Sequence, residues 1–203
     1  MAIASDVKWA AIILTGGRAT RLGGHAKTDL VSPVGETTLN LALAACDGAR
    51  PLVAVGPPVG DARVIWTREA PPFSGPARAI AAGVAALDGC DASWAVVLAC
   101  DMPSAGQAVQ ELLRHANDAD EETDGVVPVA GGHRQWLCAA YRVGPLCTAC
   151  QGLPAGGGGE SAGHLLRGLR LAEVAVPESW VADIDTPAEL VRAGFALKEK
   201  GYP

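Results

Sequence analysis

The sequence predicts an α/β fold with a mostly parallel central sheet. Two apolar runs, residues 9–14 and 94–100, have the length and composition of strands that are buried on both faces. A helical pattern follows each of them, and strands that alternate with helices pair in parallel through right-handed crossovers. In such sheets ligands bind at the carboxyl ends of the strands, so we expect functional residues just after these two runs.

The first half of the chain supplies the other elements of the parallel part. In chain order we expect a helix, two strands and two further helices at 37–46, 52–55, 63–67, 77–87 and 104–116. The helix at 77–87 is rich in Ala and Gly, which should let it pack closely against the sheet. The helix at 104–116 should begin with a capping box formed by Ser104 and Gln107.

The second half is less regular. We expect strands at 125–129, 135–142 and 171–176, and a final helix that opens within 183–190 and continues to about Lys198. A short Gly-Gly-His-Arg turn separates the first two strands, which predicts a small antiparallel, hairpin-like lobe over the site. The four consecutive glycines at 156–159 fit either a flexible linker or a mobile lid.

The composition is that of one globular domain over residues 1–203. Hydrophobic residues make up 49% of the chain and charged residues 19%, which excludes a disordered protein. The net charge of −6 argues against nucleic acid as a partner, although a local group of cations can still bind a small anion. No apolar run reaches the length of a membrane span and no secretory signal opens the chain, so we expect no membrane partner and a cytoplasmic location. The cysteines should then be reduced, with Cys147 and Cys150 as two thiols of a helix.

The run at 9–14 leads into a loop with four glycines and three cations. Its pattern, Gly16-Gly17-Arg18-x-x-Arg21-x-Gly23-Gly24-x-x-Lys27, fits neither the dinucleotide fingerprint nor the Walker P-loop. Glycines let backbone N–H groups approach phosphate oxygens, and cationic side chains neutralise the remaining charge. At the end of a parallel strand such a loop predicts a polyphosphate site, against the alternative of a surface loop with scattered charges.

Two acidic positions are candidate metal ligands. Asp101 directly follows the run at 94–100, where it fits either a turn before a helix or a ligand of Mg²⁺, which proteins hold with one or two carboxylates and substrate phosphates. The residues alone leave both interpretations open. Near the C-terminus, a capping-box pattern at 186–189 leaves Asp183 and Asp185 without a structural role, and we take Asp185 as the second candidate ligand.

These motifs resemble those of the molybdenum cofactor guanylyltransferases, the MobA-like NTP transferases. The loop at 14–27 is similar to the family's Leu-Ala-Gly-Gly-Arg-x-x-Arg-Met-Gly-Gly-x-Asp-Lys, with Thr15 in place of Ala and Ala26 in place of the acid. Further resemblance lies in Leu-Ala-Cys-Asp-Met-Pro at 98–103, in the Gly-Pro turn at 75–76, in 135–142 with Trp in place of the family's Pro, and in Asp-Ile-Asp-Thr-Pro at 183–187.

The resemblance implies a single Rossmann-like nucleotidyltransferase domain that transfers GMP from GTP to the phosphate of molybdopterin or its molybdenum-bearing form, releasing pyrophosphate. It implies Mg²⁺ as cofactor, GTP and molybdopterin as substrates, and molybdoenzymes or their chaperones as partners. Catalysis is then expected from Arg21, Lys27 and Asp101, and metal binding from Asp101 and Asp185. Nucleotide contacts are expected from Leu14, Thr15, Gly16, Gly17, Arg18, Lys27, Glu69 and Gly75.

Two alternatives stay open. One is a related nucleotidyltransferase that uses CTP or another phosphate acceptor; Gly16-Gly17 resembles the guanylyl branch more closely, while Thr15 weakens that distinction. The other is a degenerate nucleotide-binding adaptor without turnover. Intact Lys27 and Asp101 argue against an adaptor, and Ala26 keeps it open.

Overall fold

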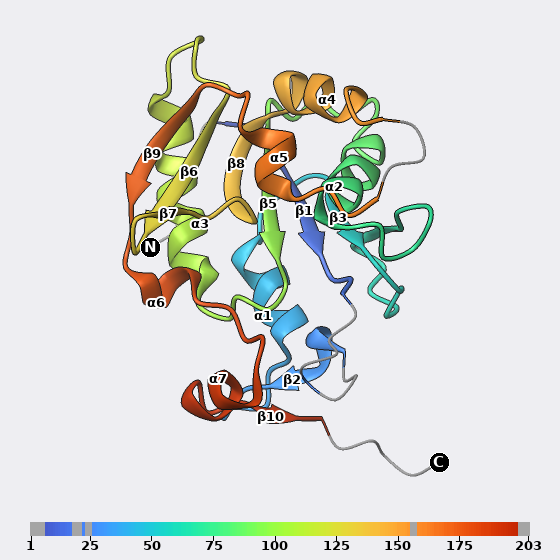
Figure 1. The fold of residues 1–203 in the computed structure, drawn as a ribbon, viewed down its shortest axis with the longest axis vertical. Helices are drawn as coiled ribbons and strands as arrows, with labels where there is room; N and C mark the ends of the chain where they lie inside the picture. The colour runs from blue at the N-terminus through green and yellow to red at the C-terminus, as the bar shows by residue number, and fades with distance from the viewer. Residues whose placement is uncertain (1–6, 18–21, 23–25, 155–157, 199–203) are drawn as a thin grey trace.

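The computed structural model describes residues 7–17, 22, 26–154 and 158–198. Its main feature is an eight-stranded sheet in the order β4-β3-β1-β5-β8-β6-β7, with β9 paired to β6 (Figure 1). The strands of this sheet are β1 (Trp9–Leu14), β3 (Leu52–Val55), β4 (Ile65–Thr67), β5 (Trp94–Ala99), β6 (Gly125–Ala130), β7 (His133–Arg134), β8 (Cys138–Arg142) and β9 (Leu171–Ala175). A second, antiparallel sheet pairs β2 (Leu30–Val31) with β10 (Ala196–Leu197).

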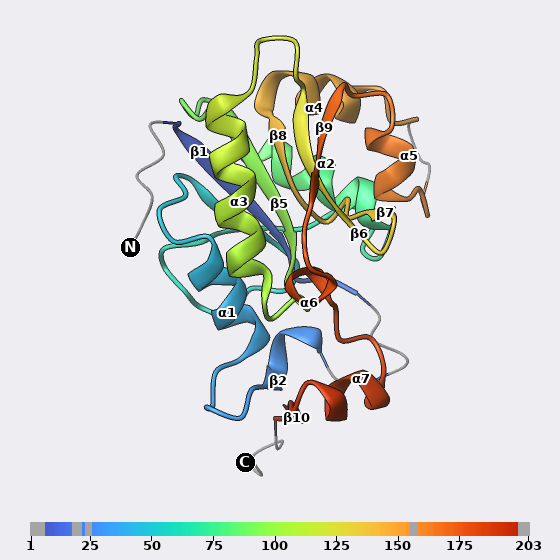
Figure 2. The same ribbon diagram turned by 90° about the vertical axis from the view of Figure 1, so that its left-hand side faces the viewer.

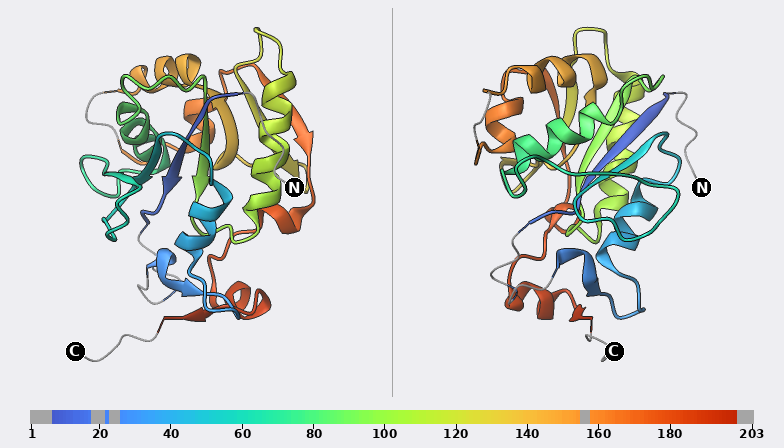
Figure 3. Two further views of the ribbon diagram at one scale, coloured as in Figure 1. Left: turned by 180° about the vertical axis from the view of Figure 1, so that it is seen from behind. Right: turned by 90° about the vertical axis from the view of Figure 1, so that its right-hand side faces the viewer.

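Helices cover both faces of the main sheet. The helices are η2 (Lys27–Asp29), α1 (Thr38–Ala45), α2 (Pro76–Ala85), α3 (Ala105–Asp118), α4 (Val143–Gln151), α5 (Ala162–Leu166), α6 (Glu178–Val181) and α7 (Pro187–Arg192). Figure 2 shows α1 and α3 on one side of the sheet and α2, α4 and α5 on the other, and Figure 3 shows the same layers from two further sides. None of the described helices has both the length and the apolar character needed to cross a membrane.

The sheet is parallel over β4, β3, β1 and β5 and changes direction at β8. Leu14 at the end of β1 is paired with Val55 on one side and with Ala99 on the other. β8 runs antiparallel to both β5 and β6, and β7 folds back on β6 as a short hairpin, while β9 is parallel to β6. The predicted α/β fold, with a mostly parallel sheet and a small antiparallel part, is confirmed.

The side chains of β1 divide the core into two halves. Ala11 and Ile13 belong to a cluster with residues of α1 and α3, whereas Ala10 and Ile12 belong to a cluster with residues of α2, α4 and α5. Because successive side chains of a strand point to opposite faces, a strand that is apolar at every position needs cover on both faces. Every residue of β1 and β5 is accordingly buried.

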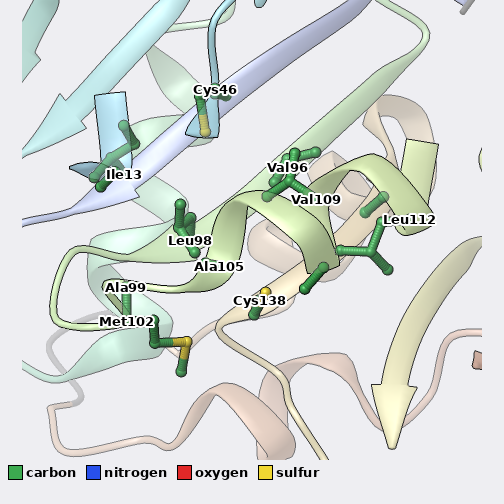
Figure 4. Close-up of a cluster of buried hydrophobic side chains, with 14 of the residues drawn as sticks. Ile13, Cys46, Val96, Leu98, Ala99, Met102, Ala105, Val109, Leu112 and Cys138 are labelled. Atoms are coloured by element: carbon green, nitrogen blue, oxygen red, sulfur yellow. The ribbon is translucent and has the colours of Figure 1, made fainter. Parts of the chain in front are cut away.

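Close helix packing follows from the residue pattern on each face. Figure 4 shows Ala105, Val109 and Leu112 of α3, at the spacing of one helix face, gathered with buried residues of β1, β5 and β8. On the other face, a Cβ placed on Gly83 of α2 would lie 2.3 Å from Ile12 Cγ2. The small residues of α2 therefore allow the close approach to the sheet that the sequence predicts.

The entry into α3 corrects one prediction. Ser104 has φ −100° and ψ 9° instead of the extended backbone of an N-cap, and its side chain makes no capping hydrogen bond. The Ala105 N–H donates instead to the Met102 carbonyl at 3.2 Å, so a turn leads directly into the helix. The predicted capping box of Ser104 and Gln107 is therefore wrong.

The C-terminal segment corrects another. The capping box of Thr186 and Glu189 is present, but α7 ends at Arg192 and does not continue to Lys198. Gly194 takes a left-handed backbone with φ 72°, and the chain then leaves the helix to pair with β2 as β10.

Smaller differences concern the ends of strands and the glycine segment. The strand predicted at 135–142 begins at Cys138, because a turn closed by its N–H and the Gln135 carbonyl precedes it. The strand predicted at 63–67 begins at Ile65. The glycine segment at 156–159 lies partly outside the described residues.

Candidate functional site

The ends of β1 and β5 bring the start of the glycine loop next to Asp101. Leu14 and Ala99 are paired in register, and the Cys100 N–H donates to the Leu14 carbonyl at 3.1 Å. Thr15 and Asp101, which follow these strand ends, are both buried. Both lie at the carboxyl edge of the parallel strands, where ligands bind in sheets of this kind.

Lys27 approaches this edge from η2 and makes two ion pairs there. Its carbonyl accepts a hydrogen bond from the Thr38 hydroxyl, which fixes η2 to the start of α1. Its ammonium donates to the carboxylates of Asp101 and Asp185, and the three side chains are only 20%, 8% and 33% exposed. Burial by itself lowers the Lys27 pKa, but the two carboxylates more than offset this effect and raise the pKa above its ordinary value.

Asp183 joins the two carboxylates that contact Lys27. The Ile184 N–H donates to the Asp101 carbonyl at 3.0 Å, which brings the segment before α7 to the end of β5. One oxygen each from Asp101, Asp183 and Asp185 lies within 4.8 Å of the others. Burial raises the pKa of Asp183, and the negative charges of Asp101 and Asp185 raise it further.

This cluster fits a divalent cation that prefers oxygen ligands. Three carboxylates this close together repel one another, and Mg²⁺ or Mn²⁺ would relieve that repulsion while accepting their hard oxygen donors. Sequence reasoning selected Asp101 and Asp185 but assigned no role to Asp183. The available signal was the spacing of Asp183 and Asp185, because side chains two residues apart on an extended segment share a face.

A pocket of about 290 Å³ opens beside Lys27 and Asp101. The residues expected to contact a nucleotide that line this pocket are Leu14, Gly16, Gly17, Lys27, Glu69 and Gly75. Thr15 lines a neighbouring pocket, also of about 290 Å³, which shares Gly16, Gly17, Lys27, Glu69 and Phe73 with the first. The structure thus brings these residues together, while Arg18 and Arg21 lie outside the described residues.

Glu69 presents a carboxylate oxygen to these pockets without a partner. The residue is buried, and its Oε1 accepts a hydrogen bond from the Phe73 N–H at 2.9 Å. Its Oε2 is also buried but has no hydrogen-bond partner among the described residues. A buried polar atom in this state carries a desolvation penalty of about 1–3 kcal/mol, which a ligand with hydrogen-bond donors would relieve.

Thr15, which stands where the resembling family has Ala, is accommodated by a glycine on the neighbouring strand end. Its hydroxyl donates to the Val55 carbonyl at 3.0 Å. A Cβ on Gly56 would lie 2.2 Å from the Thr15 Oγ1, so only glycine leaves room for this side chain. The hydroxyl is held by β3, and the backbone of the loop keeps its place at the pocket.

Residues 11–173 match the model of the MobA-like NTP transferase domain. The chain belongs to this family. Among curated proteins no sequence matches the chain.

Solved structures share the fold of this MobA-like domain at low sequence identity. Rv0371c from Mycobacterium tuberculosis H37Rv superposes with a TM-score of 0.67 at 16% identity, covering 92% of this chain and 97% of the other. It has also been solved in complex with manganese. The 2-C-methyl-D-erythritol 4-phosphate cytidylyltransferase from Francisella tularensis gives a TM-score of 0.67 at 12% identity, covering 92% and 98%. The enzyme of that name from Thermus thermophilus gives 0.60 at 17%, covering 90% and 96%.

Proposed function

We propose that this nucleotidyltransferase is a Mg²⁺-dependent guanylyltransferase that transfers GMP from GTP to the terminal phosphate of molybdopterin or its molybdenum-bearing form. The observation that carries the proposal is the meeting of Lys27 with three carboxylates beside a pocket whose wall includes the unpartnered Glu69 oxygen. The choice of molybdopterin as acceptor, the cytoplasmic location, and molybdoenzymes or their chaperones as partners rest on the resemblance of the sequence motifs.

Glu69 favours guanine over cytosine. An ionised carboxylate only accepts hydrogen bonds, and the pairing edge of guanine offers two adjacent donors, its N1–H and its amino group. Cytosine offers one amino donor beside a ring nitrogen that is itself an acceptor, so a carboxylate facing that edge meets repulsion. Cytidylyltransferases among the structural neighbours raise the alternative of CTP, but at 12–17% identity they speak for the fold alone.

The reaction follows from the charges at the strand ends. An anionic oxygen of the acceptor phosphate attacks the α-phosphorus of GTP, the bond to the bridging oxygen of the β-phosphate breaks, and pyrophosphate leaves with that electron pair. Backbone N–H groups at Gly16 and Gly17 bind the phosphates, and the Lys27 ammonium stabilises the charge that develops at the α-phosphate. Because the attacking oxygen is already ionised, no general base is required.

Asp101, Asp183 and Asp185 would hold the metal in this reaction. A bound Mg²⁺ polarises phosphoryl oxygens and neutralises their charge. The manganese complex of Rv0371c supports a divalent metal in this fold. Before a metal and the triphosphate bind, Lys27 serves as the counter-ion of Asp101 and Asp185, and the phosphates then offer its ammonium new acceptors.

A pyrophosphate-release assay with GTP, CTP and ATP, each with and without molybdopterin, tests the proposal. We expect kcat/KM for GTP to exceed that for CTP and ATP by more than tenfold, a difference of about 1.4 kcal/mol. Glu69→Gln, which replaces one acceptor oxygen with a donor of nearly the same shape, should reduce this preference. Equal kcat/KM values for GTP and CTP would contradict the guanylyl assignment, and nucleotide binding without turnover on any phosphate acceptor would favour the adaptor.

A further inference from the structure

Phe73 adopts a backbone conformation that a bulky residue rarely takes. Its φ is 63°, the left-handed region, and it is the one non-glycine residue with a positive φ in the described part of the chain. Such conformations cost free energy and persist only where the surroundings fix them; they gather at ligand clamps and active sites. The strain at Phe73 therefore calls for an account in terms of what the ring does.

Core packing does not supply that account. Phe73 belongs to none of the buried hydrophobic clusters of the described residues, and it is 49% exposed. What fixes its backbone is polar: Glu69 Oε1 accepts the Phe73 N–H at 2.9 Å, and the Ser74 hydroxyl donates to the Pro71 carbonyl at 2.6 Å. The same carboxylate that presents a free oxygen to the pocket thus holds the aromatic residue in place.

The ring lies where the two pockets of the site meet. Phe73 lines both of them, together with Gly16, Gly17, Lys27 and Glu69. The guanidinium carbon of Arg68 lies 5.4 Å from the ring centroid, a cation–π contact that also orients the ring. An exposed, oriented aromatic ring beside a buried carboxylate forms two walls of one compartment, one flat and apolar and the other a hydrogen-bond acceptor.

We propose that Phe73 is the surface on which the nucleobase of the nucleoside triphosphate stacks, an inference that rests on the proposed nucleotidyl transfer. Every base has a flat π-face, so stacking contributes affinity with little selectivity. Selectivity comes from the Glu69 carboxylate at the edge of the base. Phe73 and Glu69 therefore divide affinity and specificity between them, and the Glu69 hydrogen bond to the Phe73 N–H sets their relative position.

Nucleotide affinity and stability, measured on the same variants, test this proposal. Phe73→Gly relieves the strain, and Phe73→Ala removes the ring but keeps the strain; both retain the N–H that Glu69 accepts. We expect the Kd for GTP with Mg²⁺, measured by calorimetry, to rise by about 5- to 150-fold in both variants. The melting temperature should rise or stay level for Phe73→Gly, and Phe73→Trp should retain wild-type affinity.

Two controls separate stacking from other roles. Inorganic tripolyphosphate carries no base, so its Kd should be unchanged in the Phe73 variants. Ile65→Ala removes a side chain of similar exposure, 47%, on β4 outside both pockets, and should leave the GTP affinity unchanged.

The outcomes distinguish this inference from the proposed function. GTP affinity within twofold of wild type in Phe73→Gly and Phe73→Ala, or an equal loss of tripolyphosphate affinity, would overturn the stacking role while leaving the enzyme assignment intact. Equal Phe73-dependent binding of GTP and CTP would support stacking and overturn the guanylyl assignment. A wild-type chain that binds no nucleoside triphosphate would overturn both.

Discussion

At the carboxyl ends of β1 and β5, the paired side chains of Lys27 and Asp101 are 20% and 8% exposed, whereas the ion pair of Lys8 and Asp91 at the opposite end has side chains that are 69% and 74% exposed. The opposite end also carries the larger hollow, a pocket of about 830 Å³ that includes Lys8, Asp91 and Arg114. Size alone would place the functional site there. The state of the charges places it at the other end.

The difference lies in what water does for each set of charges. Exposed pairs such as Lys8 with Asp91, or Arg114 with Glu111 one turn away on α3, are solvated and contribute little to stability or binding. Asp101, Asp183 and Asp185 are held close together, with Asp101 buried and the pKa of Asp183 raised. Carboxylates kept in this state are poised for a cation, so a functional site is better recognised by clustered, partly desolvated charge than by volume.

Asp101→Asn should produce the largest effect, because it removes the most buried carboxylate of the cluster without changing its shape. We expect turnover to be abolished while the fold stays intact, as a carboxylate at the edge of the sheet contributes little to the core. The measurement is pyrophosphate release at saturating Mg²⁺, with the circular dichroism spectrum as a check on folding. Retention of more than a tenth of wild-type turnover would exclude Asp101 as the principal metal ligand.

Lys27→Ala should produce the next largest effect and separates an enzyme from an adaptor. If Lys27 stabilises charge that develops at the α-phosphate, its loss should lower kcat by roughly two orders of magnitude, while the affinity for GTP falls far less. Lys27→Arg should restore affinity better than rate, because a planar guanidinium cannot take the place of a compact ammonium. Calorimetric GTP affinity beside kcat makes the comparison, and equal losses in both quantities would decide for the adaptor.

The parts of the site that follow from local sequence were predictable. A buried run of apolar residues ends at Leu14 and another just before Asp101, so the sequence itself places the glycine loop and this carboxylate at strand ends. Lys27 is close to the first of these strands in sequence. Strand order then brings the two segments together, because β1 and β5 pair directly.

The parts that depend on distant contacts were not predictable. Asp183 reaches Asp101 through the hydrogen bond of the Ile184 N–H, which joins the segment before α7 to the end of a strand far earlier in the chain. The C-terminal residues leave the helical state because β10 finds a partner in β2, a tertiary pairing that overrides a helical pattern. The left-handed backbone of Phe73 depends on the Glu69 carboxylate, and nothing in the local sequence favours that conformation for an aromatic residue.

Asp91→Asn at the opposite end of the sheet should produce the smallest effect and supplies the matched control for Asp101→Asn. The substitution is chemically the same, and the residue also pairs with a lysine, here through a 2.5 Å contact between Lys8 Nζ and Asp91 Oδ2. Solvent screening leaves such an exposed pair with little net worth, so we expect turnover within about twofold of wild type and a melting temperature within about 2 °C. Pyrophosphate release and thermal unfolding provide the two values. A tenfold loss of turnover in this variant would mean that the larger pocket takes part in function, and the contrast between buried and solvated charge would then fail as a guide to the site.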